Sequence, residues 1–262
     1  MATNTSLHAL KFYKYLPFNE GSLKVITEGT LKFTSPLEFN DPFDCQPFFY
    51  AKSVESYTKA ALKGLRKSVP NPNLSPADRV RESDRLARRA KHKVSSGGFH
   101  NDLLSTVGIV SLTVDPHSIL MWSHYADHHR GFIVELAIDT TLPKSEWEHI
   151  FPLPVEYSEN RPCLDWGSLA FDLKGYFLTK SADWKYEAEH RIITTTQGPG
   201  IHRYPRAHVL SSVIAGARME KKALGMLIRA CTQASAETSK KIPVHRAALD
   251  PRKFKVRIPG FT

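Results

Sequence analysis

The pattern of apolar and polar positions predicts short strands separated by a few helices. Apolar and aromatic residues dominate positions 11–16, a short amphipathic helix follows at 23–29, and a strand follows at 31–34. Further strands are predicted where β-branched and apolar residues cluster or alternate, at 107–114, 132–138, 152–159, 176–181, 190–196 and 211–217. The chain therefore opens as strand, helix, strand and is rich in strands in its middle.

Helical patterns lie mainly early and late in the chain. They are predicted at 54–66, 77–94 and 220–238, and the segment 115–131 is a turn or a helix. Three prolines between residues 35 and 49 predict a rigid loop without regular structure. Because helices gather around several consecutive strands, we expect an α+β fold with a mixed or antiparallel split sheet and flanking helices.

The charge of the chain favours a partner or ligand that carries phosphate. The 262 residues hold 36 Lys and Arg against 26 Asp and Glu, a formal net charge of +10. We expect a single domain, 1–262, with a basic helical insertion at about 52–98. Its arginines are candidates for nucleic-acid binding, although most charge runs of this kind are solvated helix faces: Arg81, Arg85, Arg88 and Arg89.

Several classes of protein lose support. Cys45, Cys163 and Cys231 lie far apart with no C-x-x-C pair, which argues against a zinc site or a disulfide framework. The sequence has no P-loop, no G-x-G-x-x-G, no H-E-x-x-H and no G-x-S-x-G. It also has no secretion signal and no apolar run of about 18 residues, so we expect a cytoplasmic protein without a membrane partner.

The segment WKYEAEHRIITT carries the main candidate chemistry. If it is a strand entered from a turn, alternation places Glu187, Glu189 and Arg191 on one face. Two carboxylates that share a face can raise a pKa or stabilise a positive transition state. The alternative is an exposed strand face with a surface Glu–Arg pair.

Two other polar and aromatic clusters are candidates for a ligand site. In MWSHYADHH, His124 and His128 have helical spacing, but no carboxylate helper lies between them in the usual arrangement, so no metal is expected and a core or pocket histidine is favoured. In FNDPFD, Asn40 either locks a turn or lines a ligand cleft. In FYKY, Tyr15 and Lys14 point to opposite faces of a strand, and Lys14 is a cation suited to phosphate.

In combination, FYKY, FNDPFDC, MWSHYADHHRG, KSADWKYEAEHRII and VIAGARM resemble the bacterial family labelled domain of unknown function 2971. The same order of elements more distantly resembles the ADP-ribosyltransferase architecture. In that architecture a first strand carries His or Arg, a second strand carries Ser or Thr near its end, and a late strand opens with a catalytic Glu. Lys14 departs from the expected His or Arg, whereas Thr34, Ser35 and the E-x-E of Glu187 and Glu189 follow the pattern.

This resemblance implies cleavage of the nicotinamide glycosidic bond of NAD, which is then a substrate, through an oxocarbenium-like state. Glu189 would stabilise that state, and Glu187 would orient the acceptor or act as its base. Lys14 would contact a phosphate or ribose. The remaining expected NAD contacts are aromatic or polar: Tyr15, Ser35, Asn40, His124, Tyr125 and Arg191.

The function expected from these observations is mono-ADP-ribosyl transfer, as a toxin or antiphage effector that modifies nucleic acid and is held in check by an antitoxin. One alternative is a nucleic-acid or protein-binding module that keeps the fold without NAD chemistry. Another is a metal-dependent nuclease or hydrolase that uses Glu187, Glu189 and His124. The acceptor and the oligomeric state are left open by the sequence.

Overall fold

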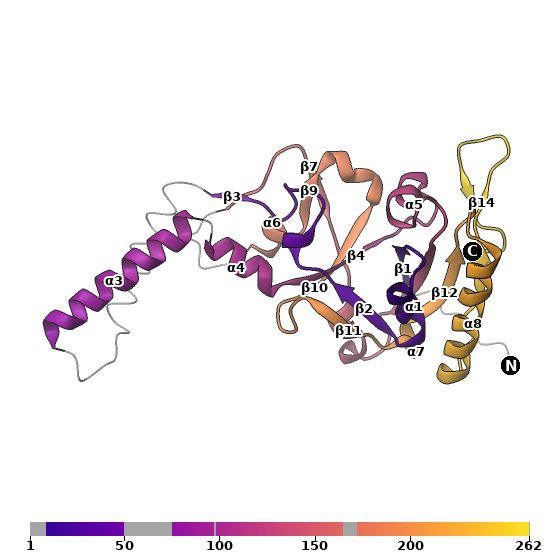
Figure 1. Ribbon diagram of the computed structural model, residues 1–262, viewed down its shortest axis with the longest axis horizontal. Coiled ribbons are helices and arrows are strands. Elements are labelled where there is room, and N and C mark those ends of the chain that lie inside the picture. The colour runs from indigo at the N-terminus through magenta and orange to yellow at the C-terminus, as the bar shows by residue number, and fades with distance from the viewer. Residues whose placement is uncertain (1–8, 50–74, 97, 165–171, 262) are drawn as a thin grey trace. The chain divides into compact units, whose positions relative to one another are not determined.

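The computed structural model describes most of the chain (Figure 1), namely residues 9–49, 75–96, 98–164 and 172–261. The helix predicted at 54–66 lies outside the described residues. Among the described residues, no helix is both long and apolar enough to cross a membrane.

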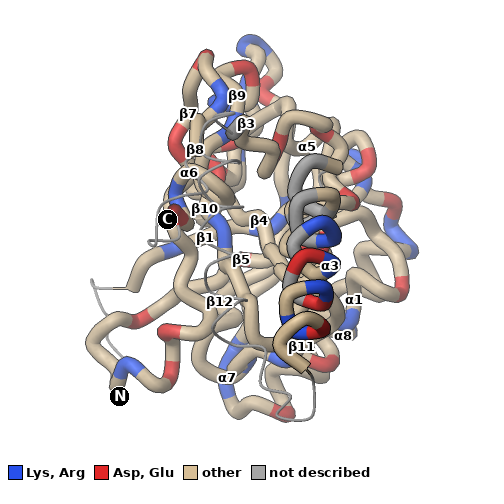
Figure 2. Tube along the Cα trace, turned by 90° about the vertical axis from the view of Figure 1, so that its left-hand side faces the viewer, with Lys and Arg blue, Asp and Glu red and all other residues tan. Residues whose placement is uncertain are grey.

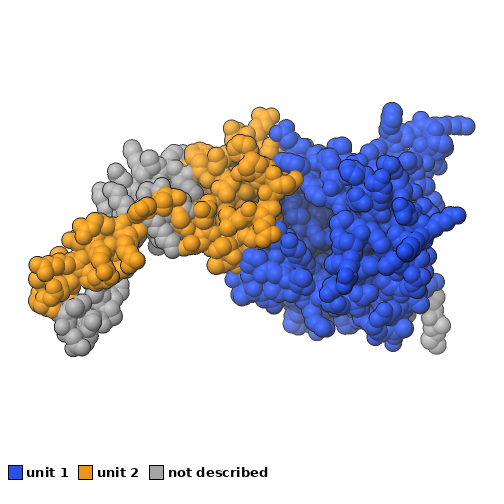
Figure 3. All heavy atoms as spheres, in the orientation of Figure 1, with its two compact units in different colours: residues 1–34, 108–155, 183–262 blue, residues 35–107, 156–182 orange. Residues whose placement is uncertain are grey.

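The chain forms two compact units (Figure 3). Unit 1 consists of residues 1–34, 108–155 and 183–262, and unit 2 consists of residues 35–107 and 156–182. The sequence-predicted basic insertion belongs to unit 2.

Unit 1 is built on a seven-stranded sheet. In spatial order its strands are β13 (Val244–Arg246), β12 (Leu210–Ala215), β5 (Phe132–Asp139), β1 (Ala9–Leu16), β4 (Gly108–Thr113), β10 (Glu189–Thr194) and β6 (Leu153–Pro154). All neighbours are antiparallel except β12 and β13, which are parallel. The predicted α+β class with a mixed, largely antiparallel sheet is confirmed.

Alternation along the strands gives this sheet two different faces. On one face, residues such as Phe12 and Ile192 pack with helices α1 (Glu20–Thr27) and α8 (Lys221–Thr238) in one apolar core. On the other face, Tyr13 and Tyr15 pack with helix α5 (Ile119–Tyr125) and with residues near the chain end in a second core. Both faces of the central strands are therefore covered.

Two small sheets complete unit 1. Strand β2 (Thr30–Phe33) pairs antiparallel with β11 (Gly200–Arg203), and β14 (Ala248–Leu249) pairs antiparallel with β15 (Val256–Arg257). The remaining helical turns are α7 (Arg206–Val209), η2 (Lys144–Glu146), η3 (Glu148–Ile150) and η4 (Ala182–Glu187).

The described residues of unit 2 form little sheet. Its parallel strand pairs are β3 (Phe48–Phe49) with β8 (Cys163–Leu164) and β7 (Glu156–Ser158) with β9 (Thr179–Ser181). Its helices are η1 (Pro36–Glu38), α3 (Pro76–Ser95), α4 (Gly98–Thr106) and α6 (Leu173–Phe177). In the predicted rigid loop, Asp41 accepts a hydrogen bond from the Phe43 amide, and buried Asp44 pairs with Lys180 at 3.6 Å. These contacts support the structural interpretation of FNDPFD.

Three sequence-predicted elements differ from the structure. The first helix begins at Glu20 because Asn19 caps it by accepting from the Ser22 amide. The strand predicted at 176–181 begins as helix α6, which Asp172 caps in the same way. The strand predicted over WKYEAEHRIITT was expected to include Glu187 but begins only at Glu189. Helix η4 precedes it, and Ala188 between them has a φ of 43°.

Candidate functional site

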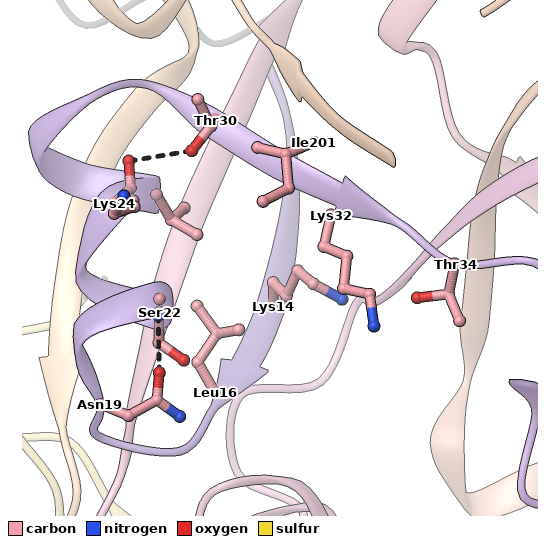
Figure 4. Close-up of a pocket in the computed structure, with 11 residues that line it drawn as sticks. Lys14, Leu16, Asn19, Ser22, Lys24, Thr30, Lys32, Thr34 and Ile201 are labelled. Carbon is pink, nitrogen blue, oxygen red and sulfur yellow. Dashed lines mark hydrogen bonds between the residues drawn. The ribbon is translucent and has the colours of Figure 1, made fainter. Parts of the chain in front are cut away.

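A pocket of about 370 Å³ lies in unit 1 among β1, α1, β2 and β11 (Figure 4). Its volume is in the range of sites for small ligands. Of the described residues that line it, none is acidic. Its polar lining residues are three lysines, three hydroxyl residues and one amide: Lys14, Lys24, Lys32, Ser22, Thr30, Thr34 and Asn19.

Local structure explains how these side chains meet. In β2, alternation buries Leu31 and Phe33 and places Thr30, Lys32 and Thr34 on the other side of the chain. In Figure 4 the amino groups of Lys14 and Lys32 extend into the same space, with Thr34 facing them. The third lysine of the pocket, Lys24, lies in α1 and forms an exposed ion pair with Glu28 at 3.5 Å.

Lys14 has the most unusual environment of the lysines in the pocket. Its Nζ donates a hydrogen bond to the carbonyl of Ser111 in β4 at 3.0 Å. Burial lowers the pKa of Lys14 to about 8, and the negative charge of Glu189 opposes that shift. A bound anion would stabilise the charged form of Lys14 directly.

The pocket therefore has the chemistry of a phosphate site. Ammonium groups and hydroxyls donate hydrogen bonds to phosphate oxygens, and the absence of a lining carboxylate leaves the local field positive. Two lysines on neighbouring elements can hold the two phosphates of a pyrophosphate at once.

The predicted catalytic glutamate, Glu189, does not line this pocket. It opens β10 and accepts from Arg191 in a bidentate pair, with Nε to Oε1 at 2.9 Å and Nη2 to Oε2 at 3.0 Å. Glu189 is 3% exposed and Arg191 is 0% exposed. Glu189 and Arg191 share a face of β10 as predicted, but Glu187 lies before this strand, in η4, so its predicted place on that face is wrong. The Glu189–Arg191 pair is buried, so the alternative of an exposed surface pair is also wrong.

Strand register shows which face this pair occupies. Glu189 and Tyr13 both pair with Thr113, one from each side of β4, so the three side chains share a face of the sheet. Lys14, adjacent to Tyr13 in β1, points to the opposite face. The sheet backbone therefore separates the carboxylate from the pocket, although its charge still acts on Lys14.

Glu187 forms a separate polar cluster beside helix α5. It is the last residue of η4, is buried, and accepts a hydrogen bond from the Tyr125 hydroxyl at 2.5 Å. His124 Nδ1 lies 3.2 Å from the hydroxyl of Tyr186. The structure thus brings together Glu187, Tyr125, His124 and Tyr186, which all come from the two motifs singled out in the sequence.

The other predicted NAD contacts lie elsewhere. The Tyr15 hydroxyl donates to the Asp115 carbonyl at 2.9 Å, and burial raises the pKa of Tyr15. Ser35 and Asn40 belong to unit 2, where Ser35 caps η1 and donates to the Leu104 carbonyl. Of the predicted contacts, Lys14 is the one that lines the pocket.

The predicted nucleic-acid-binding arginines lie on helix α3 of unit 2, where Figure 2 shows basic and acidic positions interleaved. Arg81 pairs with Asp78 at 3.5 Å and Arg85 pairs with Glu82 at 3.1 Å. Arg88 and Arg89 are exposed and form no ion pair within the described part of the chain. Part of the positive charge of this helix is therefore compensated locally.

Sequence reasoning missed Lys32, Ser22 and Thr30. Two of these residues, Thr30 and Lys32, could have been predicted from the sequence. The alternation T-x-K-x-T at 30–34 places one lysine between two threonines on one face of an extended chain. In the part of the chain that the structure describes, no group of three or more His, Cys, Asp and Glu residues is arranged to hold a metal ion.

Comparison with known families matches residues 121–192 to a family described as a protein of unknown function (DUF2971). This match supports the family predicted from the motifs over that segment, which contains β5, η4 and most of α5 and β10. No curated protein and no solved structure matches the chain.

Proposed function

We propose that this chain binds NAD, with the pyrophosphate held in the pocket between Lys14 and Lys32. One observation carries the proposal: two ammonium groups and the Thr34 hydroxyl converge in a pocket whose lining, among the described residues, includes no acid. Hydrogen bonds between charged donors and phosphate are roughly twice as strong as neutral ones. The net charge of +10 would also attract an anionic ligand from solution.

Calorimetric titration with NAD and ADP tests the proposal. Loss of one hydrogen bond to a charged group costs about 1.5–3 kcal/mol, so Lys32→Ala should weaken NAD binding roughly ten- to hundredfold. ADP should show the same loss because it carries the same pyrophosphate. Lys222→Ala, at an exposed position of α8, removes the same charge away from the pocket and should leave the affinity unchanged.

Equal NAD affinity for wild type and Lys32→Ala would overturn the proposal. Binding of nicotinamide mononucleotide with the affinity of NAD would likewise contradict a site that recognises two phosphates.

We propose ADP-ribosyl transfer as the reaction at this site, on a second observation. Lys14 of β1 and Thr34 after β2 line one pocket, and Glu189 opens a later strand. This is the order that the ADP-ribosyltransferase resemblance implies. The bond from the ribose to nicotinamide breaks with its electron pair going to nicotinamide, and an acceptor nucleophile that loses a proton forms the new bond to the ribose.

In this mechanism the Glu189 carboxylate stabilises the cationic ribose. This requires that ligand binding release Glu189 from Arg191 and that the ribose reach the face of the sheet opposite the pocket, where Glu189 lies. Release of nicotinamide from NAD, measured by chromatography, tests the reaction. Wild type and Lys222→Ala should release it and Lys32→Ala should not. NAD binding without nicotinamide release in the presence of single-stranded DNA and RNA would instead support the non-catalytic binding module.

A further inference from the structure

The tip of the β14–β15 hairpin carries the most exposed aromatic side chain among the described residues. Phe254 has a relative exposure of 103%, in the loop that extends beyond these two strands (Figure 1). Burial of a phenylalanine is worth about 1.5–3 kcal/mol, and this ring gains none of it within the chain. A single exposed apolar residue is common on protein surfaces, but the residues around Phe254 are unusual.

Basic residues surround the ring in sequence. Arg252, Lys253 and Lys255 are all exposed and come from the same loop as Phe254. Arg257 is the fourth basic residue of the hairpin, but it pairs with Asp250 at 2.7 Å. Three cations are therefore directed to solvent beside one aromatic ring.

The loop is held in its conformation by one carboxylate. Asp250 Oδ1 accepts from the amides of Arg252 and Lys253 at 2.8 and 3.0 Å, and the Asp250 amide donates to the Lys255 carbonyl at 2.9 Å. At the base of the hairpin, Val256 is fully buried in the core that contains Trp122. The ring and its cations are presented on an ordered support, so little conformational entropy is lost when a partner binds.

We propose that this hairpin is a binding site for single-stranded nucleic acid, with Phe254 stacked on a base and Lys253 and Lys255 contacting the flanking phosphates. Single-stranded nucleic acid combines unpaired base faces with a regular row of phosphates, which matches a ring set among cations. A duplex hides its base faces. A membrane surface is a poorer fit, because interfacial binding needs a larger apolar area than one ring supplies.

The site is independent of the lysine pocket and needs no NAD. Anisotropy of a fluorescein-labelled oligo-dT of about ten nucleotides, titrated with the full chain, measures it directly. Stacking on an aromatic residue is worth about 1–3 kcal/mol per base, so Phe254→Ala should weaken binding between about fivefold and about a hundredfold. Lys253→Ala should make the dependence of log affinity on log salt shallower by about 0.7.

Conservative replacements separate stacking from general hydrophobicity. Phe254→Trp should retain the affinity, and its fluorescence should be quenched by the oligonucleotide. Phe254→Leu should lose the affinity as Phe254→Ala does. Because the side chain is fully exposed, none of these changes should alter folding. Phe43→Ala, an exposed phenylalanine of unit 2 outside this hairpin, is the matched control and should bind as wild type does.

Equal affinity of wild type and Phe254→Ala for the oligonucleotide would overturn the proposal. It would also be overturned if Phe254→Leu bound as wild type does, or if the chain bound vesicles of anionic phospholipid through Phe254 and did not bind the oligonucleotide. NAD titration of Phe254→Ala should give the wild-type affinity, so failure of this inference is distinguishable from failure of the nucleotide proposal.

Discussion

Breaking the buried pair of Glu189 and Arg191 should destabilise the protein severely. The substitution Glu189→Gln keeps the shape of the side chain and removes its charge, while Arg191 stays fully buried without that counter-charge. Removal of one partner of a buried pair costs about 3–5 kcal/mol, because the desolvation cost of the remaining ion is no longer offset. For a chain of this size the midpoint of thermal unfolding should fall by roughly 10 °C.

Urea unfolding followed by tryptophan fluorescence measures this cost, with Glu28→Gln as the matched control. Glu28 pairs with Lys24 at 3.5 Å, but the side chains are 50% and 42% exposed, so that pair should contribute less than about 1 kcal/mol. A double change of Glu189→Leu and Arg191→Met replaces both charges with apolar groups. It should recover most of the lost stability, since no Arg191 charge is then buried without the Glu189 carboxylate.

Two results would refute this reasoning. One is a loss of unfolding free energy in Glu189→Gln that is no larger than the loss in Glu28→Gln. The other is a double variant whose loss of unfolding free energy equals the sum of the losses in Glu189→Leu alone and Arg191→Met alone. The outcome also determines how the transferase proposal is tested. Loss of nicotinamide release in Glu189→Gln counts as a catalytic effect only when the variant is folded at the temperature of the assay.

Four further outcomes follow from the same structure. Burial lowers the pKa of Lys14 to about 8, so its amine loses its proton as pH rises through 8. Calorimetry should therefore show an NAD affinity that falls above pH 8 and does not change with pH just below it. Lys14→Met should abolish binding yet raise the free energy of unfolding in urea by up to about 3 kcal/mol at neutral pH, because the charged form is disfavoured by burial. Charge reversal of Arg88 and Arg89 should weaken oligonucleotide binding in the anisotropy assay and leave NAD affinity unchanged, and a loss of both would contradict separate sites. Gly131→Ala should cost more than about 3 kcal/mol in thermal or urea unfolding, because its Cβ would lie 2.1 Å from the carbonyl oxygen of Leu16.

The sheet of unit 1 was largely predictable because its strands have strong apolar patterns. Strands β5 and β12 bury most of their residues and are mainly apolar, although β5 includes Glu135 and β12 includes Ser211 and Ser212. Strand β1 is rich in aromatic residues, and both Phe12 and Tyr13 are buried. The pairing of β2 with β11 could not be predicted, since it joins residues about 170 positions apart through backbone hydrogen bonds that leave no mark in composition. Helix η4 was missed because its residues have the same alternation of polar and aromatic types as a strand.

The lysine pocket was only partly predictable for a related reason. Alternation shows that Thr30, Lys32 and Thr34 share a face of β2, but it does not show that α1 and β1 lie beside that face. The sequence prediction centred on two neighbouring acids, Glu187 and Glu189, whereas the described polar residues that line this pocket are lysines, hydroxyl residues and an amide. Pockets formed by tertiary packing need the fold before their chemistry can be recognised.

Alternation in the first strand places a firm constraint on any mechanism. Tyr15 and Lys14 are adjacent in β1, so they point to opposite faces of the sheet, and the Tyr15 hydroxyl is engaged by the Asp115 carbonyl. A ligand whose phosphates lie between Lys14 and Lys32 therefore cannot stack on Tyr15 without breaking the strand. If Glu189 acts on that ligand, its carboxylate must leave Arg191, and carboxylate and ligand must meet although they lie on opposite faces of the sheet. Lys14 extends towards β4 on the pocket face, where it donates to the Ser111 carbonyl. Lys14 is thus the residue through which the phosphate pocket and the buried acid influence each other, and a change in its pKa on removal of the Glu189 charge would be the direct sign of that coupling.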